Sequence, residues 1–262
     1  MIILLLISSF VLSLGFFFNK AQNILPIKKD PSSKKFISIA PAGLYGAYTL
    51  GITSFILDNY NTENFLFLGG SSGSWNSLIG CYKYNSKDLV DKLLLQSFFE
   101  KSSVSKLQDN LSNYFLENYN SSDFNLDRLY MSVSVFDNFR LVNKVIANFT
   151  SLNDAIESCR ASCHIPLLTS DQFIRRYRGN IVFDAGFTIF PPRNLFDFFI
   201  ISANKYNSEN LQYALSGLIK RNFSNEIINE LYNKGYNDAL DHKKDLDLYF
   251  NNVDLPFYMH YY

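Results

Sequence analysis

The segment Phe67-Leu-Gly-Gly-Ser-Ser-Gly-Ser-Trp75 places two adjacent serines among small residues. With Ser71 at its centre, Gly69-Gly70-Ser71-Ser72-Gly73 fits the pattern Gly-x-Ser-x-Gly, whereas centring the pattern on Ser72 loses the last glycine. In a nucleophile elbow the serine occupies a strained strand-to-helix turn, and small neighbours let the chain pass closely. The spacing therefore predicts Ser71, and not Ser72, as a nucleophile.

Asp184 is the candidate proton acceptor for such a serine. It follows the apolar run Asn180-Ile-Val-Phe183 and precedes Ala185-Gly186. An aspartate at the end of a strand can accept the proton of a nucleophile, or it can simply cap the turn that follows. Taken alone, the residue leaves both roles open.

A second glycine-containing turn, Pro41-Ala-Gly-Leu-Tyr-Gly46, precedes the serine motif. Backbone N–H groups in such a turn can form an oxyanion hole, which stabilises the negative charge of a tetrahedral intermediate. A plain connection between a strand and a helix is the alternative.

The elements around these turns indicate a repeated unit. Residues 36–40 and 65–68 are short apolar runs typical of buried strands. Residues 44–59 carry apolar or small side chains at helical spacing, and residues 72–81 also favour a helix. The order strand, turn, helix, strand, turn, helix predicts a parallel sheet covered by helices.

The later elements are predicted by the same signals. Ser151 begins a helix with a capping-box pattern that has Asp154 in place of glutamate, and Pro166 follows its end. The alternation in 130–136 predicts a strand that pairs with 142–149. The remaining expectations are helices within 87–118, strands at 180–183 and 198–202, and packing helices in the rest of the chain.

The N-terminus carries an uncharged segment from Ile2 to Phe18. At about 1.5 Å per residue it spans roughly 26 Å, enough for the core of a bilayer. The lysines follow the segment, so the positive-inside rule predicts a single-pass anchor with the next domain in the cytoplasm. A cleaved signal sequence is the alternative, with a secreted or luminal protein. It is favoured by the N-x-S/T sequons at Asn110, Asn120, Asn148 and Asn222.

We therefore expect residues 1–19 to be the anchor or signal sequence and residues 20–34 a linker. Residues 35–205 would form the catalytic domain, and residues 206–262 a C-terminal helical packing segment. Lysine plus arginine and aspartate plus glutamate both number 24, so charge gives no case for a nucleic-acid partner. Cys159, Cys163 and His164 are close in sequence but lack a fourth ligand, which favours buried thiols over a metal site.

Four stretches together resemble one family. They are Ile37–Gly51, Phe67–Ser74, Ser158–Pro166 and Phe183–Phe187. Their order and spacing are similar to those of patatin-like phospholipases, most of all the adiponutrin and adipose triglyceride lipase branch. The resemblance extends from about Lys35 to Pro192. It implies an α/β protein with a three-layer patatin-like fold, in which helices cover both faces of a mostly parallel central sheet. The N-terminal transmembrane helix would precede this fold.

The resemblance also implies a Ser–Asp dyad, Ser71 and Asp184, with no histidine, metal or cofactor. It places the oxyanion hole at the N–H groups of Ala42, Gly43 and Ser72. The motif glycines are Gly46, Gly69, Gly73 and Gly186. The sequence departs from the family at Pro41, which replaces a glycine and has no N–H, at Tyr45 and at Ala185.

The expected function is a membrane-associated lipid acyl hydrolase, a phospholipase A or acylglycerol lipase that works through an acyl-enzyme. Its substrate would be a phospholipid or an acylglycerol, and transfer of the acyl group to another alcohol is an open variant. Two alternatives remain. One is a catalytically inactive membrane protein with the patatin fold. The other is a Ser-His-Asp hydrolase that uses His242 or His260.

Overall fold

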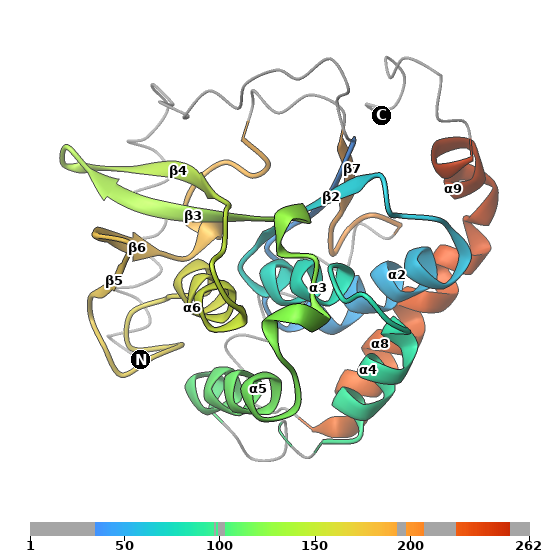
Figure 1. Ribbon diagram of the computed structural model, residues 1–262, viewed down its shortest axis with the longest axis horizontal. Coiled ribbons are helices and arrows are strands. Elements are labelled where there is room, and N and C mark those ends of the chain that lie inside the picture. Colours follow the sequence, from blue (N-terminus) through green and yellow to red (C-terminus); the bar gives the residue numbers. More distant parts are fainter. Residues whose placement is uncertain (1–34, 97, 99–102, 193–197, 207–223, 252–262) are drawn as a thin grey trace.

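The structure is a computed structural model that describes residues 35–96, 98, 103–192, 198–206 and 224–251 (Figure 1). The expected anchor or signal sequence and the expected linker, residues 1–34, lie outside these residues. In the part of the chain that is described, none of the helices combines the length and apolar character needed to cross a membrane.

The expected strand–helix–strand–helix unit is confirmed. It consists of β1 (Lys35–Ile39), α2 (Gly46–Asn59), β2 (Phe65–Gly70) and α3 (Ser72–Gly80). A single 3-10 turn, Gly43–Tyr45, leads into α2. β1 and β2 pair in parallel with Ile39 beside Gly69, so both glycine-containing turns leave the same end of the sheet.

The other predicted elements are also present among the described residues. The Ser151 hydroxyl caps α6 (Leu152–Ser162) by accepting a 3.1 Å hydrogen bond from Asp154 N, as its sequence predicts. The short strand β5 (Arg175–Tyr177) was not predicted. The remaining elements are α4 (Ser86–Leu94), α5 (Val104–Asn118), β3 (Leu129–Asp137), β4 (Arg140–Ile146), α6 (Leu152–Ser162), β5 (Arg175–Tyr177), β6 (Asn180–Phe183), β7 (Phe198–Ile201), α8 (Asn225–Asp241) and α9 (Lys243–Phe250).

The described strands form one mixed sheet and not the mostly parallel sheet that we expected. The pairs β1–β2, β1–β7 and β2–β3 are parallel, whereas β3–β4, β3–β6 and β5–β6 are antiparallel. Two hairpins, β3–β4 and β5–β6, and the long-range antiparallel pairing of β6 with β3 account for the difference. The two-residue turns of the hairpins, Asn138-Phe139 and Arg178-Gly179, have positive φ at both positions, which is the signature of the type I′ turn that joins antiparallel strands.

The strands β2 and β6 meet end to end along one edge of β3. β4 pairs with β3 from Met131 to Asp137 and fills the other edge. β2 runs parallel to β3 and its Gly70 lies opposite Ser132, while β6 runs antiparallel and its Phe183 lies opposite Ser134. The carboxyl ends of β2 and β6 therefore point toward each other. The residues that follow these strands are Ser71 and Asp184.

The main core lies between one face of the sheet and the helices. Ile37, Phe67 and Met131 from the sheet pack with residues of α2, α3 and α6. In Figure 1, α3 lies between α6 and α2, in front of the sheet. On the opposite face Phe36 and Leu68 pack with side chains of strands and with Phe190, and no residue of a described helix belongs to that cluster. The sequence-based expectation of helices on both faces therefore stays a prediction.

Helix α8 covers another side of α2. The two helices cross at two glycines: a Cβ on Gly51 would lie 2.1 Å from Tyr232 O, and a Cβ on Gly235 would lie 2.0 Å from Tyr48 O. The Tyr48 hydroxyl also donates a 2.7 Å hydrogen bond to Asp238 Oδ2. Packing against α8 together with α3, α4 and the sheet buries the residues from Tyr48 to Ile56. Residues 224–251 are therefore packed into the domain that carries Ser71.

Candidate active site

Ser71 occupies the turn between β2 and α3 with an unusual backbone conformation. Its φ is 51° and its ψ is −128°, a combination that residues other than glycine rarely adopt. The residue precedes the first turn of α3, whose leading N–H groups have no partner within the helix and favour negative charge. Such a strained turn at a helix N-terminus is the geometry expected of a nucleophile elbow.

The structure brings the two predicted dyad residues together. Ser71 Oγ donates a 2.6 Å hydrogen bond to Asp184 Oδ2. The other carboxylate oxygen, Asp184 Oδ1, accepts a 2.7 Å bond from Gly186 N. Asp184 thus also caps the turn after it, so the two roles that its sequence position suggested are both present. Both side chains are buried, with residue exposures of 8% and 5%.

Burial shifts the titration of Asp184. Loss of hydration disfavours the charged carboxylate and is the largest cause, while the hydrogen bonds from Ser71 and Gly186 act in the opposite direction. The net effect raises the pKa of Asp184 to about 6. A carboxylate with this pKa is a stronger base than an exposed aspartate and is still ionised at neutral pH, as a proton acceptor must be.

The motif glycines are sites of close packing. A Cβ on Gly73 would lie 2.2 Å from Ile39 O, and a Cβ on Gly69 would lie 2.4 Å from Gly73 O. A Cβ on Gly46 would lie 2.8 Å from the Cβ of Ser72, and one on Gly186 would lie 3.0 Å from Asp184 Oδ1. Gly73 lets the start of α3 rest on the end of β1, Gly69 lets it lie against β2, and Gly46 lets the start of α2 approach Ser72.

The predicted oxyanion loop lies beside the dyad, but one of its N–H groups already has a partner. A Cβ on Gly186 would lie 3.6 Å from the Cβ of Pro41, which places the loop next to the turn after Asp184. The N–H of Ala42 donates to Ser72 Oγ at 3.2 Å. Gly43 and Ser72 each begin a helical segment, where N–H groups have no intrahelical partner. Ala42 N–H can bind another acceptor only when its bond to Ser72 opens.

A buried asparagine fixes the segment after Asp184. Asn143 Nδ2 donates to Ser132 Oγ at 2.8 Å, to Thr188 Oγ1 at 3.1 Å and to Ile189 O at 3.1 Å. Thr188 also shares a 2.9 Å hydrogen bond with Ser134. The turn that carries Asp184 is thus tied to β3 and β4.

The end of α6 contacts the backbone of both dyad residues, which the sequence did not predict. Ser162 Oγ accepts a 2.8 Å hydrogen bond from Ser71 N and donates a 2.7 Å bond to Ser132 O. The carbonyl of His164 accepts a 2.7 Å bond from Asp184 N. The motif Ser162-Cys163-His164-Ile165-Pro166 was visible in the sequence, but nothing in it indicated which groups it would bind.

The cysteines are buried thiols and no competing nucleophile is found among them. All three are free and buried. Cys163 lies near the elbow, because its sulfur is 3.9 Å from Ser74 Oγ, which donates to Ser71 O. Burial raises the pKa of the Cys163 thiol to about 12, so it stays protonated and unreactive at neutral pH.

The two described histidines have partners other than the dyad. The Nδ1 atom of His164 lies 3.2 Å from Ser170 Oγ, and the ring is buried. His242 ends α8, where its Nδ1 is 2.8 Å from Asp238 O and its ring stacks on Tyr206 at 4.2 Å. His260 lies outside the described residues. Within those residues, no cluster of three or more histidine, cysteine or acidic side chains is placed to bind a metal ion.

Comparison with known proteins adds no family to this geometry. No protein-family profile matches the chain, and no curated protein sequence matches it significantly. The chemistry of the site therefore rests on the arrangement of its own residues.

Proposed function

We propose that the protein is a serine acyl hydrolase of the patatin-like type that acts on lipid esters through a Ser71–Asp184 dyad. One observation carries the proposal: the hydroxyl of a serine with positive φ, at the N-terminus of α3, donates directly to a buried carboxylate. This arrangement supplies a nucleophile, its base and an electropositive helix end at one point.

The proposed reaction needs only groups of the chain, an ester and water. Ser71 Oγ attacks the ester carbonyl carbon while Asp184 takes the hydroxyl proton. The N–H groups of Gly43 and Ser72 stabilise the oxyanion, joined by Ala42 N–H once Ser72 Oγ releases it. The protonated Asp184 then returns its proton to the departing alkoxide. Water hydrolyses the acyl-enzyme with Asp184 again acting as base, which regenerates Ser71 and releases the fatty acid.

The lipid substrate and the location of the protein are part of the proposal. The resemblance to patatin-like phospholipases supports a phospholipid or acylglycerol substrate, and the apolar segment Ile2–Phe18 supports a membrane anchor with the catalytic domain in the cytoplasm. A secreted or luminal protein is the alternative for the same segment. The finer fold, a three-layer patatin-like arrangement with the domain boundaries given above, belongs to this proposal too.

A fluorophosphonate probe tests the proposal, because it bonds covalently to an activated serine. We expect the full chain, purified in detergent micelles, to be labelled, and Ser71→Ala to lose the label. Ser72→Ala is the matched control: it removes a hydroxyl from the adjacent residue, whose side chain faces Ala42 N and not Asp184. Absence of labelling in the wild-type chain would overturn the proposal, and loss of labelling only in Ser72→Ala would identify Ser72 as the nucleophile.

Substrate class then follows from release of fatty acid. Wild-type chain that has not been exposed to the probe would be given mixed micelles of phosphatidylcholine and, separately, emulsified triacylglycerol, with Ser71→Ala as the blank. Release of fatty acid from either lipid class by the wild type, with none released by Ser71→Ala, supports a lipid acyl hydrolase. A protein that reacts with the probe in the labelling experiment, but in the release assay cleaves only short water-soluble esters, would contradict the lipid part of the proposal.

A non-catalytic protein is the second candidate, and two observations favour it. Pro41 cannot donate a hydrogen bond, and Ala42 N–H is bound to Ser72 Oγ. If these features leave the oxyanion without enough hydrogen-bond donors, Ser71 and Asp184 would still be paired but would not catalyse ester hydrolysis. A chain that folds and yet neither reacts with the probe nor releases fatty acid would establish this candidate.

A further inference from the structure

The hydrogen-bond ladder between β2 and β3 has an inserted side chain where the elbow begins. The last backbone pair is Gly70 opposite Ser132. At the next residue β2 turns away, and the hydroxyl of Ser162 lies between the strands: it accepts from Ser71 N and donates to Ser132 O. Ser132 and Ser162 are fully buried, so no solvent can replace this bridge.

The bridge has a specific task at Ser71. A positive φ in a residue with a side chain persists only where neighbouring contacts hold it. Here Ser74 N and Ser74 Oγ donate to Ser71 O, and Ser162 Oγ accepts from Ser71 N. The contacts through Ser74 come from the helix that Ser71 itself begins, whereas the contact through Ser162 comes from a separate helix. Ser162 thus ties the elbow to the rest of the domain.

The segment that contains Ser162 also binds the backbone of Asp184, the proposed base. Two residues after Ser162, the carbonyl of His164 accepts a 2.7 Å hydrogen bond from Asp184 N. The backbones of Ser71 and Asp184 are therefore both bonded to residues 162–164. Contacts to this one segment therefore act on their relative placement in addition to the 2.6 Å side-chain bond.

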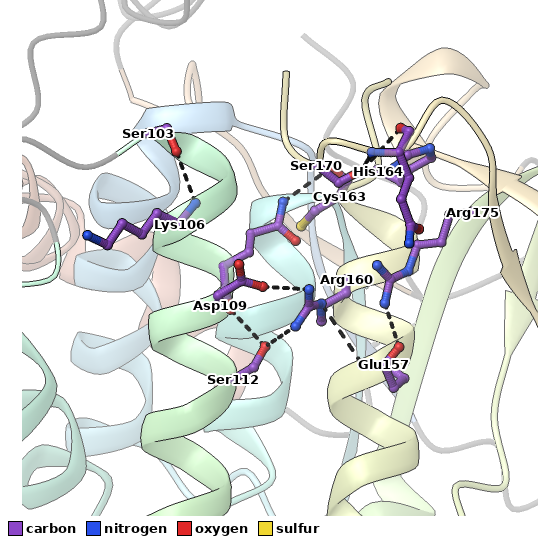
Figure 2. A network of polar contacts seen from close by, with 12 residues as sticks. Ser103, Lys106, Asp109, Ser112, Glu157, Arg160, Cys163, His164, Ser170 and Arg175 are labelled. Carbon is purple, nitrogen blue, oxygen red and sulfur yellow. Dashed lines mark hydrogen bonds and ion pairs between the residues drawn. The ribbon is translucent and has the colours of Figure 1, made fainter. Parts of the chain in front are cut away.

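The far side of α6 is fixed as well. Figure 2 shows Arg160 pointing toward Asp109 and Ser112 of α5, with a 2.6 Å ion pair to Asp109. Glu157 of α6 pairs with Arg175 at the start of β5. The carbonyl of Cys163 accepts from Gln108 Nε2 at 3.4 Å. The helix is thus anchored to α5 and β5 at one side while its end meets the dyad.

We propose that the last residue of α6 and the two residues that follow it, Ser162–His164, form a positioning clamp for the Ser71–Asp184 pair, with the Ser162 hydroxyl as its essential contact. Ser162 is a positioning residue: it touches neither substrate nor the reacting oxygen, and it acts by fixing the backbone of the nucleophile. The catalytic consequence of the clamp rests on the proposed function, whereas its effect on the Ser71 backbone does not.

Two readouts test the clamp in the full chain. The first is the rate of fluorophosphonate labelling as a function of probe concentration. It gives separately the maximal labelling rate and the probe concentration at half of that rate. The second is hydrogen–deuterium exchange in peptides that cover residues 69–74. Ser162→Ala removes the bridge, and Ser162→Cys, which keeps the size but bonds weakly, gives a second variant if Ser162→Ala does not fold. Ser77→Ala is the matched control, because its hydroxyl is equally buried and makes no hydrogen bond in the described residues.

We expect Ser162→Ala to lower the maximal labelling rate roughly tenfold with an unchanged half-saturation, and to accelerate exchange at Ser71 by a similar factor. Ser162→Cys should fall between it and the wild type, and Ser77→Ala should match the wild type. Wild-type labelling rates in Ser162→Ala would overturn the clamp and leave the proposed function standing. If the wild type is not labelled, the proposed function fails, and unchanged exchange in Ser162→Ala would overturn the clamp independently.

Discussion

Ser71 Oγ lies 2.6 Å from Asp184 Oδ2, although the two residues are 113 positions apart in the chain. They meet because β2 and β6 approach each other along one edge of β3 and end opposite Ser132 and Ser134. Neither strand bonds the other, so β3 is the element that brings their carboxyl ends together.

Asp184→Asn tests the carboxylate as base. The amide has nearly the same shape and can still accept from Gly186 N, but it cannot take the proton of Ser71. We expect labelling by a fluorophosphonate to slow roughly 100-fold or more while the chain stays folded. The measurement is the labelling rate with a thermal melt alongside. An Asp184→Asn variant that reacts within threefold of the wild type would contradict the assignment.

The raised pKa of Asp184 predicts how labelling depends on pH. Because the base must be ionised, the labelling rate should fall as the pH drops through about 6, the pKa of the buried carboxyl. The check is a series of labelling rates from pH 4.5 to 8 within the range in which the chain is folded. A rate that is flat between pH 5 and 7 would argue against Asp184 as the titrating group.

The same shift predicts a stability difference. The folded chain binds the Asp184 proton more tightly than the unfolded chain, whose aspartate titrates near 3.9. Stability is therefore lost as the pH rises from about 4 to about 6, by up to roughly 3 kcal/mol, and is constant above that range. Asp184→Asn lacks this loss, so its melting temperature should exceed that of the wild type at pH 7.5 and approach it at pH 4.5. An equal difference in melting temperature between Asp184→Asn and the wild type at both pH values would contradict the raised pKa of Asp184.

Gly73→Ala should be among the more destabilising single changes in the domain. Its methyl group would lie 2.2 Å from Ile39 O, and backbone atoms on both sides must move to admit it. We expect a loss of about 2–3 kcal/mol in the free energy of unfolding. Gly179→Ala is the control: its φ of 77° disfavours a side chain but the space around it is open, so it should cost only about 1 kcal/mol. Chemical denaturation measures both, and the reverse order would show that the elbow is looser than described.

Removing histidines tests the triad alternative. His242 stacks on Tyr206 at the end of α8, and His164 bonds to Ser170, so neither ring is placed to relay a proton from Ser71. We expect the double variant His242→Gln, His260→Gln to be labelled at the wild-type rate. Loss of labelling in a folded double variant would favour a Ser-His-Asp hydrolase over the dyad.

Much of the fold could be predicted because its signals are local. The apolar runs of β1 and β2, the glycine turns and the Ser151 cap each depend on a few neighbouring residues, and all were found where the sequence indicated. The prediction of a mostly parallel sheet was wrong because the turns at Asn138-Phe139 and Arg178-Gly179 form hairpins and because β6 pairs antiparallel with β3. The second pairing joins segments that are distant in the sequence, so no local pattern indicated it. The bonds made by Ser162 depend on the end of α6 lying against β3, which no local pattern encodes.

The crossing of α2 and α8 has a consequence for folding during synthesis on the ribosome. Tyr48 and Asp238, which share a hydrogen bond across that crossing, are separated by 190 positions. The helix behind the oxyanion loop therefore leaves the ribosome long before the segment that covers it, and contacts between such distant segments form late and slowly. A nascent chain that already contains both Ser71 and Asp184 still exposes one side of α2. The dyad can be expected to settle into its final geometry only after α8, residues Asn225–Asp241, has left the ribosome.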